Sequence, residues 1–209
     1  MTSKLDELPS ADLLAKIADY PVLDRDGKSH RFQDLYAGPD ATERTLILFV
    51  RHFFCGSCQE YLARLSTALP PSTLSTISPP TSIIVIGCGS PGLIPHYATQ
   101  SATPYTIYAD PSRKLYKELG MITSWTVGEQ PKYISKSVPR LAVEGMWQAL
   151  KQATSGLMFS GGPGEQQGGE FLFEKKDGEE GAVTWCHRMQ GSWGRTEIED
   201  LEGVLRGKK

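Results

Sequence analysis

Thr45-Leu-Ile-Leu-Phe-Val-Arg-His-Phe-Phe-Cys-Gly-Ser-Cys58 is the stretch of sequence that decides the fold. The run up to Val50 is almost continuously apolar, as is typical of a central strand covered on both faces. From Ser57 onward the apolar residues fall on one side of a helix, until Pro70-Pro71 ends it. The stretch therefore predicts a buried strand that leads, through two closely spaced cysteines, into a helix.

Strands and helices continue to alternate after this unit, and the alternation favours a parallel sheet with right-handed crossovers. The predicted elements are strands over 81–87 and 105–108, helices over 93–101 and 113–119, a β-hairpin over 170–186 and a closing helix over 197–205. Ser112 and Thr196 are the expected caps of the two later helices.

We divide the chain into a helical extension over 1–19 and one α/β domain over 20–209. The domain is expected to open with a hairpin over 20–32 and a loop over 33–42. The segment at about 121–169 interrupts the alternation and is interpreted as an insertion. It holds a predicted helix over 139–153 and a glycine-rich loop over 154–169, which is open to interpretation as a mobile flap.

Composition narrows the class of protein. The chain has 209 residues, of which 39% are hydrophobic and 22% charged, and a formal charge of −2. These values fit a globular protein with a real core and give no basic field for nucleic acid. The longest apolar runs are too short to span a bilayer, and residues 1–10 contain no apolar segment typical of a secretory signal. We therefore expect a cytoplasmic protein with no membrane partner.

The Cys55–Cys58 pair is the strongest functional motif. A cysteine at the start of a helix lies near unpaired backbone N–H groups and the positive end of the helix dipole, which favour a thiolate. Arg51 adds a fixed positive charge beside the pair, and His52 adds a second one when its imidazole is protonated. The spacing brings both sulfurs to one side of the first turn, where one attacks and the other resolves. We expect both to be reachable from solvent.

Two other interpretations of the pair were weighed. A zinc site would use Cys55 and Cys58 with two further ligands, and the candidates are Cys88, Cys186, His52 and His187. Simple packing of both cysteines is the second alternative. A redox pair is favoured over both, because close cysteines in a reducing compartment are more often redox-active than structural. Cys88 and Cys186 are interpreted as buried core residues, and no metal is expected.

The chain also resembles the peroxiredoxin-like 2 branch of the AhpC/TSA antioxidant family, in a form like that of fungi. The segments that carry the resemblance are Phe49–Tyr61, Tyr108–Pro111, Gly145–Trp147, Gln166–Phe171 and His187–Arg188. The resemblance implies a thioredoxin-like fold with a central mixed sheet flanked by helices, and an inserted helix and glycine-rich loop before the C-terminal hairpin. It also implies an antioxidant or thiol-reductase activity.

The chain departs from the related patterns at several positions. Where true peroxiredoxins carry Pro-x-x-x-Thr-x-x-Cys, this chain has Arg51, Cys55 and Cys58, and their later arginine falls on about Gly168. Where thioredoxins carry a cis-proline, the chain has Gln167-Gly168-Gly169. Substitutes for the missing arginine are expected among Arg51, Arg140 and Arg188. The expected supporting residues of the site are thus Arg51, His52, Gln167, Gly168, Gly169 and Arg188.

The sequence predicts a thiol-dependent oxidoreductase that reduces a peroxide or disulfide through Cys55 and Cys58. The thioredoxin comparison makes Cys55 the nucleophile, whereas the peroxiredoxin comparison makes it Cys58, and we favour Cys55. A thiol donor such as thioredoxin or glutathione is expected to supply electrons, with no bound cofactor, and a homodimer is left open. The alternatives are a reductase of a lipid-like endoperoxide and a non-catalytic accessory protein of a biosynthetic pathway.

Overall fold

The computed structural model describes residues 6–129, 131–134, 143–144, 146–148, 150, 156–157, 159–176 and 179–207. Most of the helix predicted over 139–153 lies outside these residues, and the division into extension, domain and insertion stays a prediction. The remaining elements can be compared with the sequence one by one.

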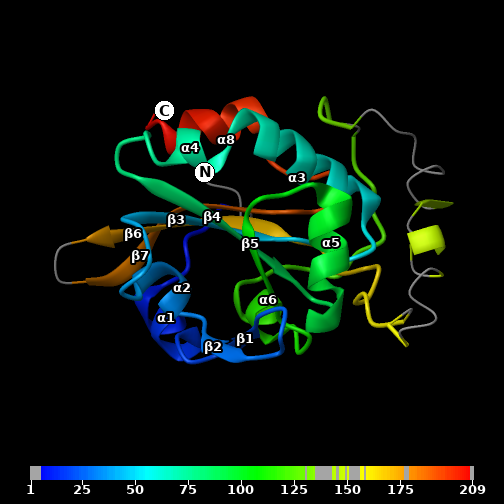
Figure 1. Cartoon of the computed structure of the whole chain (residues 1–209). Coiled ribbons are helices and arrows are strands. Elements are labelled where there is room, and N and C mark those ends of the chain that lie inside the picture. The colour runs from blue at the N-terminus through cyan, green and yellow to red at the C-terminus, as the bar shows by residue number, and fades with distance from the viewer. Residues whose placement is uncertain are drawn as a thin grey trace.

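The described strands form one seven-stranded mixed sheet in the order β2-β1-β5-β4-β3-β6-β7 (Figure 1). Its strands are β1 (Pro21–Leu23), β2 (Ser29–Arg31), β3 (Arg44–Phe49), β4 (Thr81–Gly87), β5 (Thr106–Ala109), β6 (Gly169–Lys176) and β7 (Glu179–Arg188). The strands β3, β4 and β5 run parallel, while β6 is antiparallel to β3 and β7 to β6. This confirms the α/β class and the central mixed sheet.

Helices cover both faces of the sheet (Figure 1). One face carries α3 (Gly56–Ala68), α4 (Pro71–Leu74), α5 (Ile94–Ser101) after the short 3-10 helix η1 (Pro91–Leu93), and α8 (Ile198–Leu205); the other carries α1 (Ala11–Ile17), α2 (Asp34–Ala37) and α6 (Lys114–Glu118). Within the described ranges, no helix combines the length and apolar character needed to cross a bilayer.

The strand β3 forms the middle of the core because both of its faces are covered. Leu46 and Leu48 pack with the helices α3 and α8 in one hydrophobic cluster, whereas Ile47 and Phe49 pack in a second cluster with α1, α2 and α6. All six residues of the strand are buried. The continuous apolar run in the sequence thus has the predicted cause, and it places the end of β3 between β4 and β6.

Four helix predictions needed correction. One concerns α6, whose N-cap is Arg113 in a left-handed backbone conformation and not Ser112. The segment predicted as a loop over 33–42 contains α2, because Leu35 and Tyr36 turn inward and the Tyr36 ring stacks on Phe173 at 4.0 Å. The first helix begins only at Ala11, where the Ser10 hydroxyl accepts a hydrogen bond from the backbone of the first turn. The last helix is capped by Glu197 without a side-chain bond, so Thr196 is not its cap.

Candidate active site

The two cysteines lie where the sequence places them, at the junction of β3 and α3. Cys55 is the N-cap of α3, with an extended backbone (φ −79°, ψ 102°), and Cys58 lies in the first turn. The strand β3 pairs with the parallel strand β4. In α/β sheets, ligand-binding sites commonly lie at the carboxyl ends of such parallel strands, which is where Cys55 and Cys58 lie. The predicted order of strand, cysteine pair and helix is confirmed.

Cys55 is surrounded by hydrogen-bond donors. The Arg51 guanidinium donates from Nη1 to Cys55 Sγ at 3.5 Å, and the Ser57 hydroxyl lies 3.2 Å from the same sulfur. Ser57 Oγ is also 3.4 Å from the Ser192 carbonyl oxygen, and its single proton can serve only one of these acceptors. A thiolate at Cys55 therefore has a charged donor and a hydroxyl in place.

The two thiols have opposite pKa shifts. A hydrogen bond from the Cys58 thiol is the largest cause that lowers the pKa of Cys55 well below its usual value; burial opposes it, and Arg51, His52 and Ser57 act in the same direction as Cys58. Burial is the main cause that raises the pKa of Cys58, and the thiolate at Cys55 raises it further. The arrangement favours Cys55 as the thiolate and Cys58 as the protonated partner.

Cys58 has an arginine of its own. Arg195 Nη2 lies 3.8 Å from Cys58 Sγ and donates to the Phe49 carbonyl oxygen at 2.8 Å. The same guanidinium forms a 3.4 Å ion pair with Glu170, and both side chains are buried. Neither Arg195 nor Glu170 was among the residues expected from the sequence.

Both sulfurs are shielded from solvent, contrary to the expectation from the sequence. Only 4% of Cys55 and 1% of Cys58 is exposed. Arg51 lies against Cys55 and is itself held by the carbonyl oxygens of Gly164 and Gln166, to which it donates from Nη2 at 2.5 Å and from Nε at 3.2 Å. Arg51 and the segment that holds it thus cover the Cys55 sulfur.

The glycine-rich loop forms part of that cover. Its carbonyl groups at Ser160 and Gly161 accept hydrogen bonds from the backbone N–H groups of Ser90 and Phe53, at 2.7 and 2.9 Å. With the bonds from Arg51, these contacts anchor residues 160–166 to the ends of β3 and β4. The described part of the loop is thus a hydrogen-bonded wall of the site, and its interpretation as a mobile flap stays a prediction.

His52 contributes less charge than its position suggests. Desolvation lowers the pKa of its imidazole below the ordinary value of 6.5, so that the ring is neutral at pH 7. The fixed positive charge beside Cys55 is therefore that of Arg51.

Gln167, Gly168 and Gly169, the last of which is the first residue of β6, have different surroundings. Gln167 donates from Nε2 to the Ser124 carbonyl oxygen at 2.6 Å, and its bonding is to that segment. A Cβ atom at Gly168 would collide with the Phe49 carbonyl and would come within 3.1 Å of Arg195 Nη2, so this position requires glycine. Gly169 pairs with Phe49 in the sheet. Of the three, Gly168 is the one packed against the Cys58 side of the site.

The structure does not bring Arg188 to Cys55 or Cys58. Its guanidinium donates to the carbonyl oxygens of Leu119 and Glu7 and lies over the Phe171 ring at 5.3 Å. Phe171 belongs to the core cluster on the other face of the sheet, and alternation along the strand directs Arg188 to that face. Arg140, the other named substitute, lies outside the described residues.

The remaining cysteines lie in separate places. Cys88 donates from Sγ to the Arg51 carbonyl oxygen at 2.8 Å, and burial raises its pKa to about 12. Cys186 lies 3.3 Å from the Glu7 carbonyl oxygen, and His187 contacts Asp6. All four cysteines are free thiols. Within the residues that the structure describes, no three histidine, cysteine or acidic side chains form a group that could hold a metal ion.

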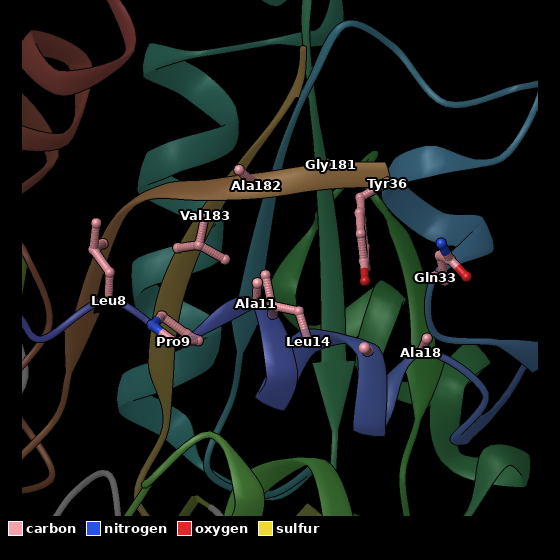
Figure 2. Close-up of a pocket in the computed structure, with 11 residues that line it drawn as sticks. Leu8, Pro9, Ala11, Leu14, Ala18, Gln33, Tyr36, Gly181, Ala182 and Val183 are labelled. Carbon is pink, nitrogen blue, oxygen red and sulfur yellow. The ribbon is translucent and has the colours of Figure 1, made fainter. Parts of the chain in front are cut away.

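An apolar cavity of about 390 Å³ lies elsewhere, between α1, α2 and β7 (Figure 2). Its walls include Leu14, Tyr36 and Val183, and none of the residues that line it is a cysteine, histidine or carboxylate. A cavity of this size suits a small apolar ligand. It lacks a nucleophile and a base, and we therefore place the active site at the cysteines.

Sequence signals for the missed residues were uneven. Glu170 and Glu174 flank the apolar run Phe171–Phe173 of a predicted strand, which makes each a candidate for a buried charge in need of a partner without telling them apart. Arg195 follows the hairpin in a loop, 137 positions after Cys58, and no local pattern distinguishes it.

Comparisons with known proteins agree with this fold and identify a family. The family described as AhpC/TSA antioxidant enzyme matches residues 64–191, a span that begins after Cys58. Peroxiredoxin-like 2C of Mus musculus and that of Homo sapiens are each 32% identical to the chain over 195 residues, which cover 93% of this chain and 79% of each relative.

Solved structures are similar in fold at much lower identity. Peroxiredoxin Q of Xanthomonas campestris has a TM-score of 0.55 at 13% identity, covering 97% of this chain and 94% of its own. A peroxiredoxin-like protein from Aquifex aeolicus has a TM-score of 0.56 at 10% identity, with coverages of 100% and 90%. These likenesses show the thioredoxin-like fold, and the identity to the curated relatives shows the family. The chain belongs to the AhpC/TSA antioxidant enzymes, as a peroxiredoxin-like protein.

Proposed function

We propose that this protein reduces a peroxide or a disulfide through Cys55 and Cys58, with Cys55 as the attacking thiolate. The observation that carries the proposal is the pairing of Arg51 and Ser57 with the Cys55 sulfur at the start of α3, at 3.5 and 3.2 Å. Family membership supports a thiol-dependent oxidoreductase in general. The environment of each sulfur supports the assignment of roles.

The proposed reaction uses only the two sulfurs as redox groups. With a hydroperoxide ROOH, the Cys55 thiolate attacks one oxygen, the O–O bond breaks, and RO⁻ leaves and takes up a proton. Cys58 then attacks the sulfenic sulfur of Cys55, a disulfide forms, and its thiol proton leaves with the hydroxide as water. A dithiol donor of the thioredoxin type, or two molecules of a monothiol such as glutathione, returns the two electrons. We place this cycle in the cytoplasm.

Burial of the sulfurs sets the access route. Arg51 donates hydrogen bonds both to Cys55 and to the loop at Gly164 and Gln166. We expect this loop to open and admit the substrate, while Arg51, which lies in the same segment as Cys55, stays beside the thiolate. We expect oxidation of Cys55 to be slower than its lowered pKa alone would give, because the open form is a minor population.

A second candidate is the reduction of a lipid-like endoperoxide, and one observation favours it. Trp125 is 75% exposed, and its ring edge packs on Gly164, the residue whose carbonyl holds Arg51. An aromatic surface at this place suits an apolar substrate. Replacement of Trp125 by alanine is expected to lower the rate of reduction of an organic hydroperoxide severalfold more than that of hydrogen peroxide.

The test is to expose reduced protein to hydrogen peroxide, an organic hydroperoxide and a small disulfide, and to follow Cys55 and Cys58 by mass spectrometry. We expect a Cys55–Cys58 disulfide with at least one oxidant and full reversal by a dithiol. Oxidation confined to Cys88 or Cys186, or no faster than that of a free thiol with every oxidant, would refute the enzyme and favour a non-catalytic accessory protein.

A further inference from the structure

The ion pair beside Cys58 is built into the core. The side chains of Arg195 and Glu170 are 2% and 0% exposed. The guanidinium lies over the Tyr61 ring at 5.0 Å, and the Tyr61 hydroxyl donates to Glu170 Oε1 at 3.3 Å. Together with the bond to the Phe49 carbonyl, these contacts hold the guanidinium against the sulfur of Cys58.

Stability alone does not account for this pair. Arg195 Nε and Glu170 Oε2 are buried and have no hydrogen-bond partner among the described residues. Each unsatisfied buried group of this kind destabilises the folded state, because it has lost its hydrogen bonds to water. A buried ion pair is also often replaceable by apolar side chains without loss of stability. The pair does, however, place a fixed cation on the thiol that acts second.

The charge on Cys55 decides when that cation becomes effective. While Cys55 is a thiolate, its negative charge opposes a second negative charge on Cys58, and Cys58 stays protonated. Once Cys55 is bonded to substrate, its charge is gone and Arg195 remains in contact with Cys58. We propose that Arg195, oriented by Glu170, activates Cys58 as the second nucleophile after Cys55 has reacted. This deepens the proposed function and rests on it.

The step balances with a disulfide RS–SR′ as substrate. The Cys55 thiolate attacks one sulfur, the RS–SR′ bond breaks, and R′S⁻ leaves. Cys58 then gives up its proton, its thiolate attacks Cys55 Sγ, the Cys55–Cys58 bond forms, and RS⁻ leaves and takes up that proton. The substrate gains two electrons and the two cysteines lose them. Arg195 stabilises the Cys58 thiolate while it exists.

Other ionisable groups near Cys58 do not take this role. Burial is the main cause that raises the pKa values of the surrounding tyrosines, and their hydroxyl groups are therefore neutral below pH 10. These tyrosines are Tyr61 on α3, Tyr97 on α5, Tyr116 on α6 and Tyr133. Arg51 acts on Cys58 as well, but it ranks after Arg195 in lowering the Cys58 pKa and contacts Cys55. Glu170 neutralises part of the Arg195 charge.

The proposal predicts opposite effects for the two members of the pair. Arg195→Met removes the cation and is expected to slow attack by Cys58 about tenfold at pH 7, equivalent to about one pKa unit. Glu170→Gln leaves the cation without its counter-ion and is expected to move the pH midpoint of the second step downward. A purely structural role would move both variants in one direction.

The experiment uses the chromogenic disulfide 5,5′-dithiobis(2-nitrobenzoate) with the full-length reduced protein in a stopped-flow instrument. Attack by Cys55 releases one thionitrobenzoate and attack by Cys58 releases the second, so the two phases report the two steps. Both phases are measured as a function of pH. We expect Arg195→Met to slow only the second phase, and Arg195→Lys, which keeps the charge, to recover part of the rate.

Arg44→Met is the matched control. Arg44 is also a buried arginine paired with a glutamate of β6, at 2.8 Å from Glu174, but it lies at the opposite end of β3. It is expected to lower stability and leave both phases unchanged. A second phase of wild-type rate in folded Arg195→Met would overturn the role of Arg195 and leave the proposed function standing. A pH midpoint of the second step that moves in the same direction in Arg195→Met and Glu170→Gln would do the same. Absence of both releases from wild-type protein, together with no Cys55–Cys58 disulfide after exposure to either hydroperoxide, would overturn the proposed function as well.

Discussion

Cys55 and Cys58 are separated by only two residues, and both are buried, yet they differ in their hydrogen-bond donors and in the direction of their pKa shifts. Cys55 has donors at the helix start, with Arg51 and the Ser57 hydroxyl on its sulfur. Cys58 lies one turn deeper, where burial raises its pKa and its cation is shared with Glu170. The difference teaches that a symmetric motif can be given an order of reaction by what surrounds it.

The origins of the two arginines also differ. Arg51 continues from the strand that carries the motif, whereas Arg195 arrives from a loop that follows the last strand. Cys55 is therefore activated by its own segment, and Cys58 is controlled by closure of the whole fold. Four experiments would break or sharpen this comparison.

Replacement of the cysteines themselves should have the largest effect. Cys55→Ser is expected to lower reduction about a thousandfold or more, because the first nucleophile is lost. Cys58→Ser is expected to complete the first step and accumulate a mixed disulfide on Cys55, visible by intact-protein mass spectrometry. The reverse pattern, with the adduct trapped on Cys58, would exchange the two roles.

Gly168→Ala should damage the Cys58 side through packing. The added Cβ would meet the Phe49 carbonyl and Arg195 Nη2, and overpacking of this kind destabilises by about 1–3 kcal/mol. Urea unfolding measures the change. Gly203→Ala in α8 is the control: no atom lies within 4 Å of its new Cβ, and we expect stability to rise by about 0.5–1 kcal/mol. Equal stability in the two variants would contradict the tight packing at Gly168.

Arg51→Met should act on the Cys55 side by charge. Because the pKa of Cys55 is lowered, its thiolate persists below the pKa of a free thiol and is lost as the pH falls through the lowered value. Removal of Arg51 is expected to move that loss to higher pH and to slow alkylation at pH 7 about tenfold for one pKa unit. Iodoacetamide kinetics against pH measure it, with Arg51→Lys as the charge-preserving control. An unchanged midpoint would remove Arg51 from the site.

Cys88→Ala should have the smallest effect. Burial raises the pKa of this thiol to about 12, so it stays protonated at neutral pH, and its bond to the Arg51 carbonyl is structural. We expect a loss of about 1 kcal/mol in unfolding free energy and a rate of Cys55–Cys58 disulfide formation within about twofold of wild type. Failure of that disulfide to form would make Cys88 the resolving thiol.

Much of the fold could be read from local patterns. The apolar run of β3, the cysteine pair and the amphipathic α3 each carry their own signal over a few neighbouring residues, and the order of elements follows. The short helix α2 was missed because its stability comes from packing of Tyr36 on Phe173, a contact between distant segments. Arg188 was wrongly expected at the site for the same reason. Alternation along β7 decides which face of the sheet Arg188 lies on only once the register of that strand is known.

By itself, the sequence determined the alternating order of strands and helices, the cysteine pair at the carboxyl end of β3 and the presence of Arg51 beside Cys55, because these depend on residues adjacent in the chain. Only the tertiary structure decided that both sulfurs are buried, that the loop at Gly164 and Gln166 covers them, and that Arg195 and Glu170 face Cys58. Burial and charge pairing are properties of segments brought together from across the chain, and no short window of sequence specifies them.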